Sequence, residues 1–400
     1  MVHRCASSFN GFVTALLQTE IPQIIQPLVA SHLVGLSGKL IQRVLTVFVK
    51  GVFDLRPMSE VRTVEWAKGR VRMIDQTRLP YKLTYVSLKN YRQVAKAIKD
   101  MTVRGAPAIG VAAAMGLALA ANANRTKDKQ RFMQELYTAA ELLRKSRPTA
   151  RNLFWAVDKI LRKAEKSTGK PSEIAAELVA EAKSMAQDDI DANLRIGENG
   201  ASLLEDGDQV LTHCNAGTLA TVSYGTALAP VRTALRQGKR IRVIVTETRP
   251  RLQGARLTTY ELLRDGTPVT LIVDGAAGYA MRQGMVQRVI VGADRITRKF
   301  LANKVGTYLI ALAAQANGIP FYVAAPASTF DLDDEQSEVK IEERNSREVT
   351  HIGSSRIPPT GVSVFNPAFD LTPIELVSGF ITDRGLLTPA MVQAGASVLG

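Results

Sequence analysis

Cysteine and histidine are scarce in this chain of 400 residues, which has only two cysteines and four histidines. Two cysteines, Cys5 and Cys214, provide no disulfide framework, and a chain without one fits a reducing compartment, so we expect a cytoplasmic protein. The cysteines and histidines also show no paired spacing such as CxxC or HxxxH. The sequence therefore predicts no metal site.

Long runs of basic residues are missing too, although the net charge is +14, from 51 Lys and Arg against 37 Asp and Glu. The densest basic cluster, residues 236–242, leads into an apolar run and has no aromatic residues between its charges. Nucleic-acid patches concentrate charge on one face and often add stacking side chains. We expect a solvated basic surface and no nucleic-acid partner.

A membrane span is not expected either. Residues 105–124 carry no charge, but Ala and Gly dominate them, and Pro107 and Asn122 interrupt them. This composition favours a helix buried inside the protein over a span in lipid. The start of the chain also lacks the order of basic, apolar and small residues found in signal peptides.

Residues 1–57 differ from the rest of the chain, because they contain few charges and two of the four histidines. The composition changes at Met58. We interpret residues 1–57 as an atypical leader, which is either an amphipathic extension or upstream sequence joined by a mistaken gene start.

Two regions follow the leader. Residues 58–205 begin with a β-hairpin predicted around Lys68-Gly69 and continue from Tyr91 with apolar residues at helical spacing. Residues 206–400 alternate helical stretches with the apolar runs QVLTHC, IRVIVTE, VTLIVD, RVIVGAD and PFYVAA. This alternation predicts an α/β protein with a mainly helical N-terminal domain and a Rossmann-like parallel-sheet C-terminal domain.

Polar residues follow the predicted strands, among them Cys214, Asp274 and Asp294. Ligands of such sheets bind at the carboxyl ends of the strands, so these side chains should share one pocket. Cys214 is either a small buried residue or a thiol activated by helix amino ends. Asp294 is either a helix cap or a desolvated carboxyl that holds a proton near neutral pH.

An anion site is predicted where Arg104-Gly105-Ala106-Pro107 opens the Ala-rich helix. The glycine permits close approach to the backbone, and the free N–H groups act with the arginine on an anion. The nucleotide signatures GxxxxGK[ST] and GxGxxG are absent. The predicted ligand is therefore a small sugar phosphate, with no cofactor.

The chain resembles the methylthioribose-1-phosphate isomerases in ordered blocks from about Met58 to Pro389, among them VRGAPAIGVAAAMG, RPTARNLFWA, LTHCNAGTLAT, ETRPRLQGARLTTYEL, VIVGADRI, IEERNSREV and NPAFDLTPIEL. The resemblance implies a metal-independent aldose–ketose isomerase of methionine salvage, which converts 5-methylthioribose 1-phosphate into 5-methylthioribulose 1-phosphate. It also implies a homodimer.

The resemblance further implies roles for individual residues. Asp294 corresponds to the proton donor of the family and Cys214 to its second catalytic residue. The substrate-binding positions correspond to Arg104, Gly105, Ala106, Arg147, Gln253, Asn303 and Lys304.

Two alternatives share the fold implied by the resemblance. One is an isomerase of ribose 1,5-bisphosphate or of a 5-deoxypentose 1-phosphate, which Thr246, Arg251 and the segment 273–277 favour slightly. The other is a regulatory binding protein related to translation initiation factor 2B, which would have no reason to keep the catalytic pair.

Two further segments are expected to be structural. The segment Glu342 to Arg344 is interpreted as an ordered surface loop or as part of intersubunit ion pairs. Residues 372–375 predict a helix start, with Pro373 early and Glu375 as in a capping box.

Overall fold

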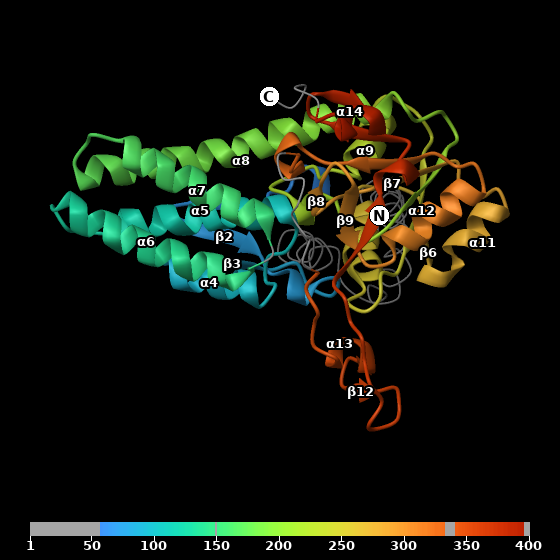
Figure 1. Ribbon diagram of the computed structural model, residues 1–400, viewed down its shortest axis with the longest axis horizontal. Helices are drawn as coiled ribbons and strands as arrows, with labels where there is room; N and C mark the ends of the chain where they lie inside the picture. Colours follow the sequence, from blue (N-terminus) through green and yellow to red (C-terminus); the bar gives the residue numbers. More distant parts are fainter. Residues whose placement is uncertain (1–56, 149, 333–340, 396–400) are drawn as a thin grey trace, which may run out of the picture. The chain divides into compact units, whose positions relative to one another are not determined.

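Two regions of different architecture make up the part of the chain that the computed structural model describes, residues 57–148, 150–332 and 341–395 (Figure 1). Both belong to one unit, Arg56–Gly400. The predicted leader, residues 1–57, lies outside the described residues apart from Pro57. The boundary expected near residue 205 falls in the turn between the last long helix and the first strand of the main sheet.

A three-stranded antiparallel sheet opens the helical region. β1 (Val64–Ala67) pairs with β2 (Arg70–Ile74), and β2 pairs with β3 (Tyr85–Leu88). Lys68 and Gly69 join β1 to β2 and have φ values of 50° and 72°. Two successive positive φ values fit the turn that matches the twist of a hairpin. The hairpin predicted at this position is confirmed.

Helices follow where the apolar spacing predicts them. Their bounds are α4 (Tyr91–Lys99), α5 (Ala106–Ala123), α6 (Lys129–Ser146), α7 (Arg151–Lys166) and α8 (Pro171–Ala201). α5 packs against each of the other four. By length and composition α5 would suffice to cross a membrane, and 72% of it is buried inside the protein. A helix that is apolar all round belongs in a core, and the buried helix predicted over residues 105–124 is confirmed.

The second region is built on a seven-stranded sheet with the order β15-β14-β10-β7-β4-β5-β6. Neighbouring strands are parallel except for β14 and β15 at one edge. The predicted strands are all present, as β4 (Gln209–Thr212), β5 (Arg242–Thr246), β6 (Val269–Ile272), β7 (Arg288–Val291) and β10 (Phe321–Ala324). The sequence missed β14 (Gly379–Thr382) and β15 (Gly385–Leu387).

Helices cover both faces of this sheet. One face carries α11 (Ala277–Arg282), α12 (Thr307–Ala316) and α14 (Pro389–Gln393). The other carries the C-terminal part of α8 with α9 (Ala229–Arg236) and α10 (Thr259–Arg264). Along β7, Val289 and Val291 join the first core and Ile290 joins the second. The predicted α/β class with a Rossmann-like parallel sheet is confirmed.

A small antiparallel sheet adjoins the main one and consists of β8 (Arg295–Ile296), β9 (Phe300–Lys304) and β13 (Phe369–Pro373). The helix start predicted at residues 372–375 is wrong. Thr372 and Pro373 end β13, and only a 3-10 turn, η7 (Ile374–Leu376), follows, without a side-chain cap. Pairing of β13 with β9 outweighs the local capping signal.

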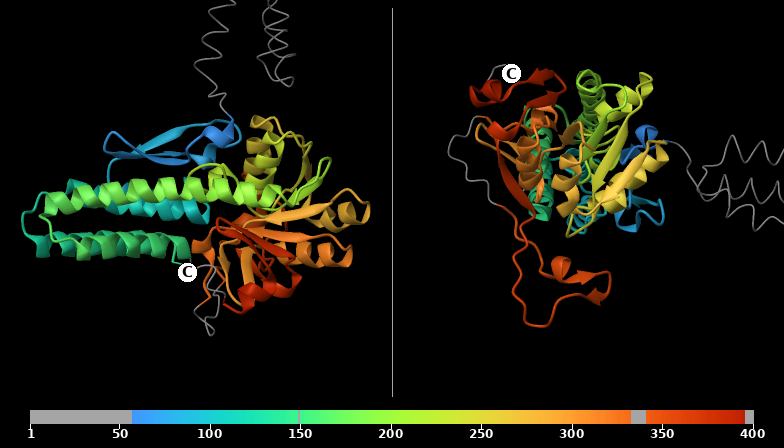
Figure 2. Two further views of the ribbon diagram at one scale, coloured as in Figure 1. Left: turned by 90° about the horizontal axis from the view of Figure 1, so that it is seen from above. Right: turned by 90° about the vertical axis from the view of Figure 1, so that its right-hand side faces the viewer.

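An arm projects from the body and carries α13 (Arg347–Thr350), β11 (His351–Ile352) and β12 (Ser355–Arg356) (Figures 1 and 2). The remaining elements are short turns between the larger ones. They are η1 (Met58–Glu60), η2 (Gln76–Arg78), η3 (Thr218–Ala220), η5 (Asp274–Ala276), η6 (Ala327–Thr329) and the π-helical turn η4 (Gly254–Thr258).

Candidate active site

A cavity of about 150 Å³ lies at the carboxyl ends of β4, β5 and β7, where an open α/β sheet binds its ligands. Its wall brings together most of the predicted site residues, namely Arg104, Gly105, Arg147, Cys214, Gln253, Asp294 and Lys304. Ala106 and Asn303 lie outside this wall.

Cys214 follows β4 and is held in an unusual backbone conformation. Its φ is +66°, in the left-handed region that a residue with a side chain rarely adopts. Its N–H donates to Oγ1 of Thr248 at 2.9 Å, and its carbonyl accepts from Oγ1 of Thr258 at 2.6 Å. The side chain is a free thiol on the cavity wall, 9% exposed. These bonds fix the backbone that carries the thiol.

The loop after β5 holds Cys214 and is itself held by the next strand. Thr248 has a φ of +65°. The backbone N–H groups of Thr248 and Arg249 donate to the two carboxylate oxygens of Asp274, each at 2.7 Å. Asp274 follows β6, so the residues at the ends of three neighbouring strands support one another.

Asp294 follows β7, the neighbour of β4 in the sheet. Its N–H donates to the carbonyl of Ala302 at 3.0 Å, which fixes the backbone at the start of the small sheet. Burial raises the pKa of its carboxyl, while Lys304, Arg104 and Arg147 act in the opposite direction. Asp294 therefore holds its proton more tightly than an exposed aspartate, as a general acid requires.

Lys304 and Asn303 are consecutive on β9 and point to opposite sides of the strand. The Lys304 ammonium faces the cavity, donates to the carbonyl of Ala368 at 2.6 Å and lies 4.6 Å from the centre of the Phe369 ring. Burial lowers its pKa. The amide of Asn303 instead donates to Oγ1 of Thr307 at 3.0 Å, at the start of α12.

Arg104 and Gly105 precede α5 and lie on the cavity wall, at the place where the sequence predicts an anion site. The Arg104 guanidinium donates to Oδ1 of Asn215 at 2.5 Å and to its carbonyl at 2.8 Å. Gly105 has a φ of +98°, and a Cβ there would lie 2.3 Å from the Cα of Ala220. Only glycine fits. Ala106 is the first residue of the helix, where a backbone N–H is free of helical partners.

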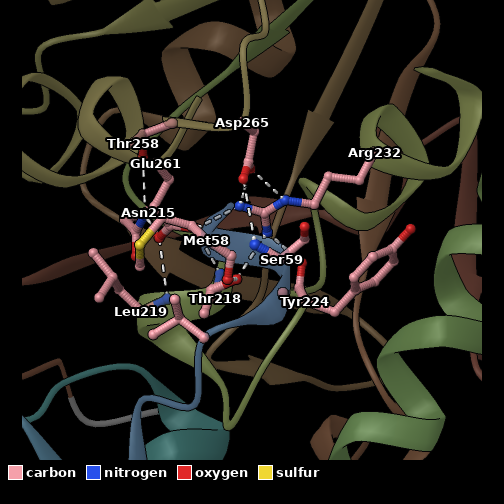
Figure 3. Close-up of polar contacts among 12 residues, drawn as sticks. Met58, Ser59, Asn215, Thr218, Leu219, Tyr224, Arg232, Thr258, Glu261 and Asp265 are labelled. Carbon is pink, nitrogen blue, oxygen red and sulfur yellow. Dashed lines mark hydrogen bonds and ion pairs between the residues drawn. The ribbon is translucent and has the colours of Figure 1, made fainter. Parts of the chain in front are cut away.

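Asn215, which accepts from Arg104, belongs to a buried polar network with Glu261 and Arg232, and Figure 3 shows this network. The amide of Asn215 donates to Oε1 of Glu261 at 2.9 Å, and Glu261 also accepts from the N–H groups of Thr218 and Leu219. Arg232 donates to Glu261 at 2.8 Å, and Glu261 has no exposed surface. The sequence gave no signal for this network, because its members are separated along the chain and meet only in the fold.

Two predicted binding residues have buried polar atoms without a partner. Nε of Arg147 and Oε1 of Gln253 make no hydrogen bond within the described part of the chain. Burial lowers the pKa of Arg147, and its guanidinium lies 3.7 Å from Glu342. Since buried polar atoms are almost always paired, these two are suited to a ligand that enters the cavity.

Several wall residues were not predicted as binding residues: Gln76, Thr77, Met101, Arg251, Arg256, Leu257, Arg344, Ala368 and Phe369. Arg251 and Arg256 flank Gln253, so their closeness to it in the sequence was an available signal. Arg344 was expected in a surface loop or an intersubunit ion pair. The segment is a loop, and within the chain Arg344 pairs with Glu342 at 2.7 Å and with Glu348 at 2.9 Å.

The cavity wall is strongly positive. Among the described residues it has six cationic side chains and one carboxylate, that of Asp294. Such a wall suits a phosphorylated ligand.

His213 lies behind this wall. Its Nε2 lies 2.9 Å from the carbonyl of Val305, which can only accept, so Nε2 carries the proton. Nδ1 then accepts from Oγ1 of Thr246 at 2.6 Å. Burial lowers the pKa of His213, which keeps the ring neutral. His213 thus ties β4 and β5 to the backbone next to Lys304.

No group of three or more His, Cys, Asp or Glu side chains suitable for a metal occurs in residues 57–148, 150–332 and 341–395. The cavity wall brings together an acid, a thiol and cations. Such a set can protonate a sugar oxygen, accept or deliver a second proton, and bind a phosphate.

Comparison with known proteins agrees with this chemistry. A model of the Initiation factor 2 subunit family matches residues 102–389. The methylthioribose-1-phosphate isomerase of Thermosipho melanesiensis is 50% identical over 329 residues, which cover 82% of this chain and 95% of the relative. That of Thermotoga neapolitana is 48% identical over 343 residues, covering 85% and 99%.

Solved structures give the same result. The 5-methylthioribose 1-phosphate isomerase of Pyrococcus horikoshii is 43% identical, with a TM-score of 0.78, and the match covers 87% of this chain and 99% of that one. A protein described as translation initiation factor eIF-2B, subunit delta, from A. fulgidus is 47% identical, with a TM-score of 0.76, and the match covers 85% and 99%. This chain belongs to the initiation factor 2 subunit family and, within it, to the methylthioribose-1-phosphate isomerases.

Proposed function

We propose that this chain isomerises 5-methylthioribose 1-phosphate to 5-methylthioribulose 1-phosphate, a step of methionine salvage. The names of the relatives point to this substrate. One observation carries the proposal: Cys214 and Asp294, at the ends of the neighbouring strands β4 and β7, share the wall of one cavity with free cationic groups.

The chemistry explains why an acid is needed. The phosphate on carbon 1 locks the sugar as a ring, which cannot open spontaneously as a free sugar does. In the reaction the ring oxygen gains a proton, one hydrogen moves from carbon 2 to carbon 1, and the hydroxyl on carbon 2 loses its proton to become the ketone. Asp294 protonates the ring oxygen, because burial raises its pKa and keeps a proton available.

Cys214 acts at carbons 1 and 2 while the hydrogen moves. Two routes are compatible with this reaction. The hydrogen moves directly as a hydride, or it leaves carbon 2 as a proton and a proton is added at carbon 1 through a cis-enediol. Deuterium placed at carbon 2 distinguishes the routes, because a hydride shift retains the label at carbon 1 and the enediol route exchanges it with solvent.

The phosphate binds between Arg104, the amino end of α5 at Gly105 and Ala106, and Lys304. Arg104 and Lys304 are bonded to uncharged partners, Asn215 and the carbonyl of Ala368, so their positive charge is not neutralised. Charged hydrogen bonds to phosphate are strong under these conditions.

Arg147 and Gln253 bind the sugar hydroxyls or the phosphate through their unpartnered atoms, which are Nε of Arg147 and Oε1 of Gln253. Asn303 acts indirectly, by fixing the start of α12 next to Lys304.

The test is an assay on the purified chain with methylthioribose 1-phosphate and, in parallel, ribose 1,5-bisphosphate, in the presence of a chelator. We expect turnover of the first substrate at a higher kcat/KM than of the second. Turnover of neither, together with binding to an initiation factor, would instead support a regulatory protein like the one described from A. fulgidus.

We further propose a homodimer in the cytoplasm, which the family resemblance and the two cysteines support. Sedimentation of the purified chain tests the dimer, and localisation of the tagged chain tests the compartment.

A further inference from the structure

A series of ion pairs with alternating charges runs along one part of the cavity wall, from the loop after β5 to the end of α6. Arg251 donates from Nη1 to Oε1 of Glu348 at 2.6 Å, and Arg344 donates from Nη2 to the same oxygen at 2.9 Å. Arg344 also donates to Glu342 at 2.7 Å, and Glu342 lies 3.7 Å from Arg147. Arg147, Arg251 and Arg344 line the cavity.

Glu348 is the central anion of this series of ion pairs. Nε of Arg344 lies 3.1 and 3.0 Å from its two carboxylate oxygens, in addition to the bond from Nη2. Burial raises the pKa of Glu348, but the hydrogen bonds from Arg344 and Arg251 outweigh burial and lower this pKa to about 2. Glu348 is therefore an anion at any physiological pH and neutralises charge on both arginines.

The same part of the wall has apolar surface. Met101 lines the cavity, and its sulfur lies 3.9 Å from Nη2 of Arg344. Leu257 and Phe369 line the cavity as well. This surface suits a substituent without charge.

Apart from Arg147, which acts on the pKa of Asp294 and lies 3.7 Å from Glu342, the cations fall into two groups by their partners. Arg104 and Lys304, whose polar partners are uncharged, act on the pKa of Asp294 and so lie near the proposed acid. Arg251 and Arg344 are paired with a carboxylate. Arg256 is a neighbour of Arg251, since Arg251 lowers its pKa, although less than burial does. Without Glu348, Arg251 would lose its carboxylate and Arg344 would keep only Glu342, so these three arginines would carry net positive charge for a second phosphate.

We propose that Glu348 determines specificity: by neutralising Arg251 and Arg344 it prevents the cavity from binding a second phosphate, and it thereby selects a sugar 1-phosphate whose carbon 5 carries an uncharged group. The inference rests on the proposed function and names a residue that acts on the choice of substrate, through two arginines.

The test compares the wild-type chain with Glu348→Gln, which keeps the shape of the side chain and removes its charge. The measured quantity is kcat/KM for methylthioribose 1-phosphate and for ribose 1,5-bisphosphate. We expect the ratio to shift toward the bisphosphate by about tenfold or more, mainly through its KM, because charged hydrogen bonds to phosphate are gained.

Glu343→Gln is the matched control. Glu343 is an exposed neighbour in the same segment, so the variant removes the same charge from the protein without freeing the two arginines. The ratio of the two kcat/KM values should be the same for Glu343→Gln as for the wild-type chain. The double variant Glu348→Gln/Arg251→Met should lose most of the gain, because one of the freed cations is removed.

Three results would overturn the proposal. The first is that Glu348→Gln lowers both kcat/KM values equally, as a purely structural role predicts. The second is that Glu343→Gln shifts the ratio of the two kcat/KM values as much as Glu348→Gln does. The third is that the double variant keeps the full gain in kcat/KM for the bisphosphate.

Binding separates this inference from the proposed function. If the wild-type chain turns over neither sugar phosphate, the proposed function fails. Calorimetric titration with ribose 1,5-bisphosphate then still tests Glu348, since tighter binding by Glu348→Gln supports its role and unchanged binding refutes it.

Discussion

The helical region and the sheet region differ in what fills their interiors. The helical region is built around α5, whose side chains form a continuous apolar core. The sheet region has an apolar core on each face, but a polar side chain follows within three residues of the end of β4, β5 and β7, the strands that reach the cavity. The two regions contribute to the site in the same way, since Arg104, Arg147, Cys214 and Asp294 all lie at the end of an element or just beyond it.

The physical reason is hydrogen bonding. Inside a helix or a sheet the backbone groups are paired, whereas at an end they are free to orient a side chain or bind an anion. If this view is right, changes at the ends should remove activity and leave stability intact. Changes in the helical core should do the opposite.

The largest effect is expected for Asp294→Asn. Loss of a general acid lowers kcat by about 10² to 10⁴-fold. Burial raises the pKa of Asp294. When the pH rises above the pKa of an ordinary aspartate, ionisation of Asp294 therefore destabilises the folded protein, and asparagine removes this cost. Stopped assays and thermal unfolding at pH 8 should therefore show lost turnover with a melting temperature no lower than wild type. Asp100→Asn, at an exposed helix end, is the control.

Cys214→Ser tests the second member of the pair. The hydroxyl is close in size to the thiol but holds its proton far more tightly, so we expect kcat to fall by about 10²-fold. Binding of the substrate, measured by calorimetry, should change little. Full activity of Cys214→Ala would contradict a catalytic thiol.

Leu117→Ala tests the helical core. Leu117 lies in the middle of α5 with no exposed surface. The cavity left behind should lower the free energy of unfolding by about 2–5 kcal/mol. Urea unfolding measures this loss, while kcat at a temperature where the protein stays folded should remain near wild type. Leu142→Ala on α6, where 38% of the side chain is exposed, should have a much smaller effect.

The smallest effect concerns Asp189, at a contact between the two regions. It lies on α8 and accepts from the N–H of Val222 at 2.7 Å. Burial raises its pKa to about 7. Wild-type stability should therefore fall as the pH rises from about 4 to about 7, because the folded state disfavours the ionised form over this range.

Asp189→Asn should remove the share of this pH dependence that Asp189 causes. We expect a gain of about 1–2 kcal/mol at pH 8 that disappears toward pH 4, measured by urea unfolding. Asp188→Asn, with a side chain 63% exposed, is the neighbouring control. A gain of equal size at both pH values would show that charge is not the cause.

Much of the fold could be predicted because its signals are local. Apolar spacing placed α4 to α8, and buried apolar runs placed β4, β5, β6, β7 and β10. The strands β14 and β15 escaped, since their short runs resemble the turns around them. The start of a helix at Thr372 was wrongly predicted, because a distant strand, β9, pairs with that segment.

The site residues likewise fall into those with a local sequence signal and those without one. Cys214, Asp294 and Arg104 could be named from the sequence, since each stands at a recognisable end of an element. Glu348 and Arg344 could not, because their importance comes from Arg251, almost a hundred residues away, which only the folded chain brings within hydrogen-bond distance.

Local sequence patterns therefore established the class of fold, the strand ends near the cavity and the family. The tertiary structure alone decided which charges on the cavity wall are free and which are neutralised. The reason is that a residue's charge is fixed by its type, whereas its effect on a ligand depends on partners that the folded chain brings close to it.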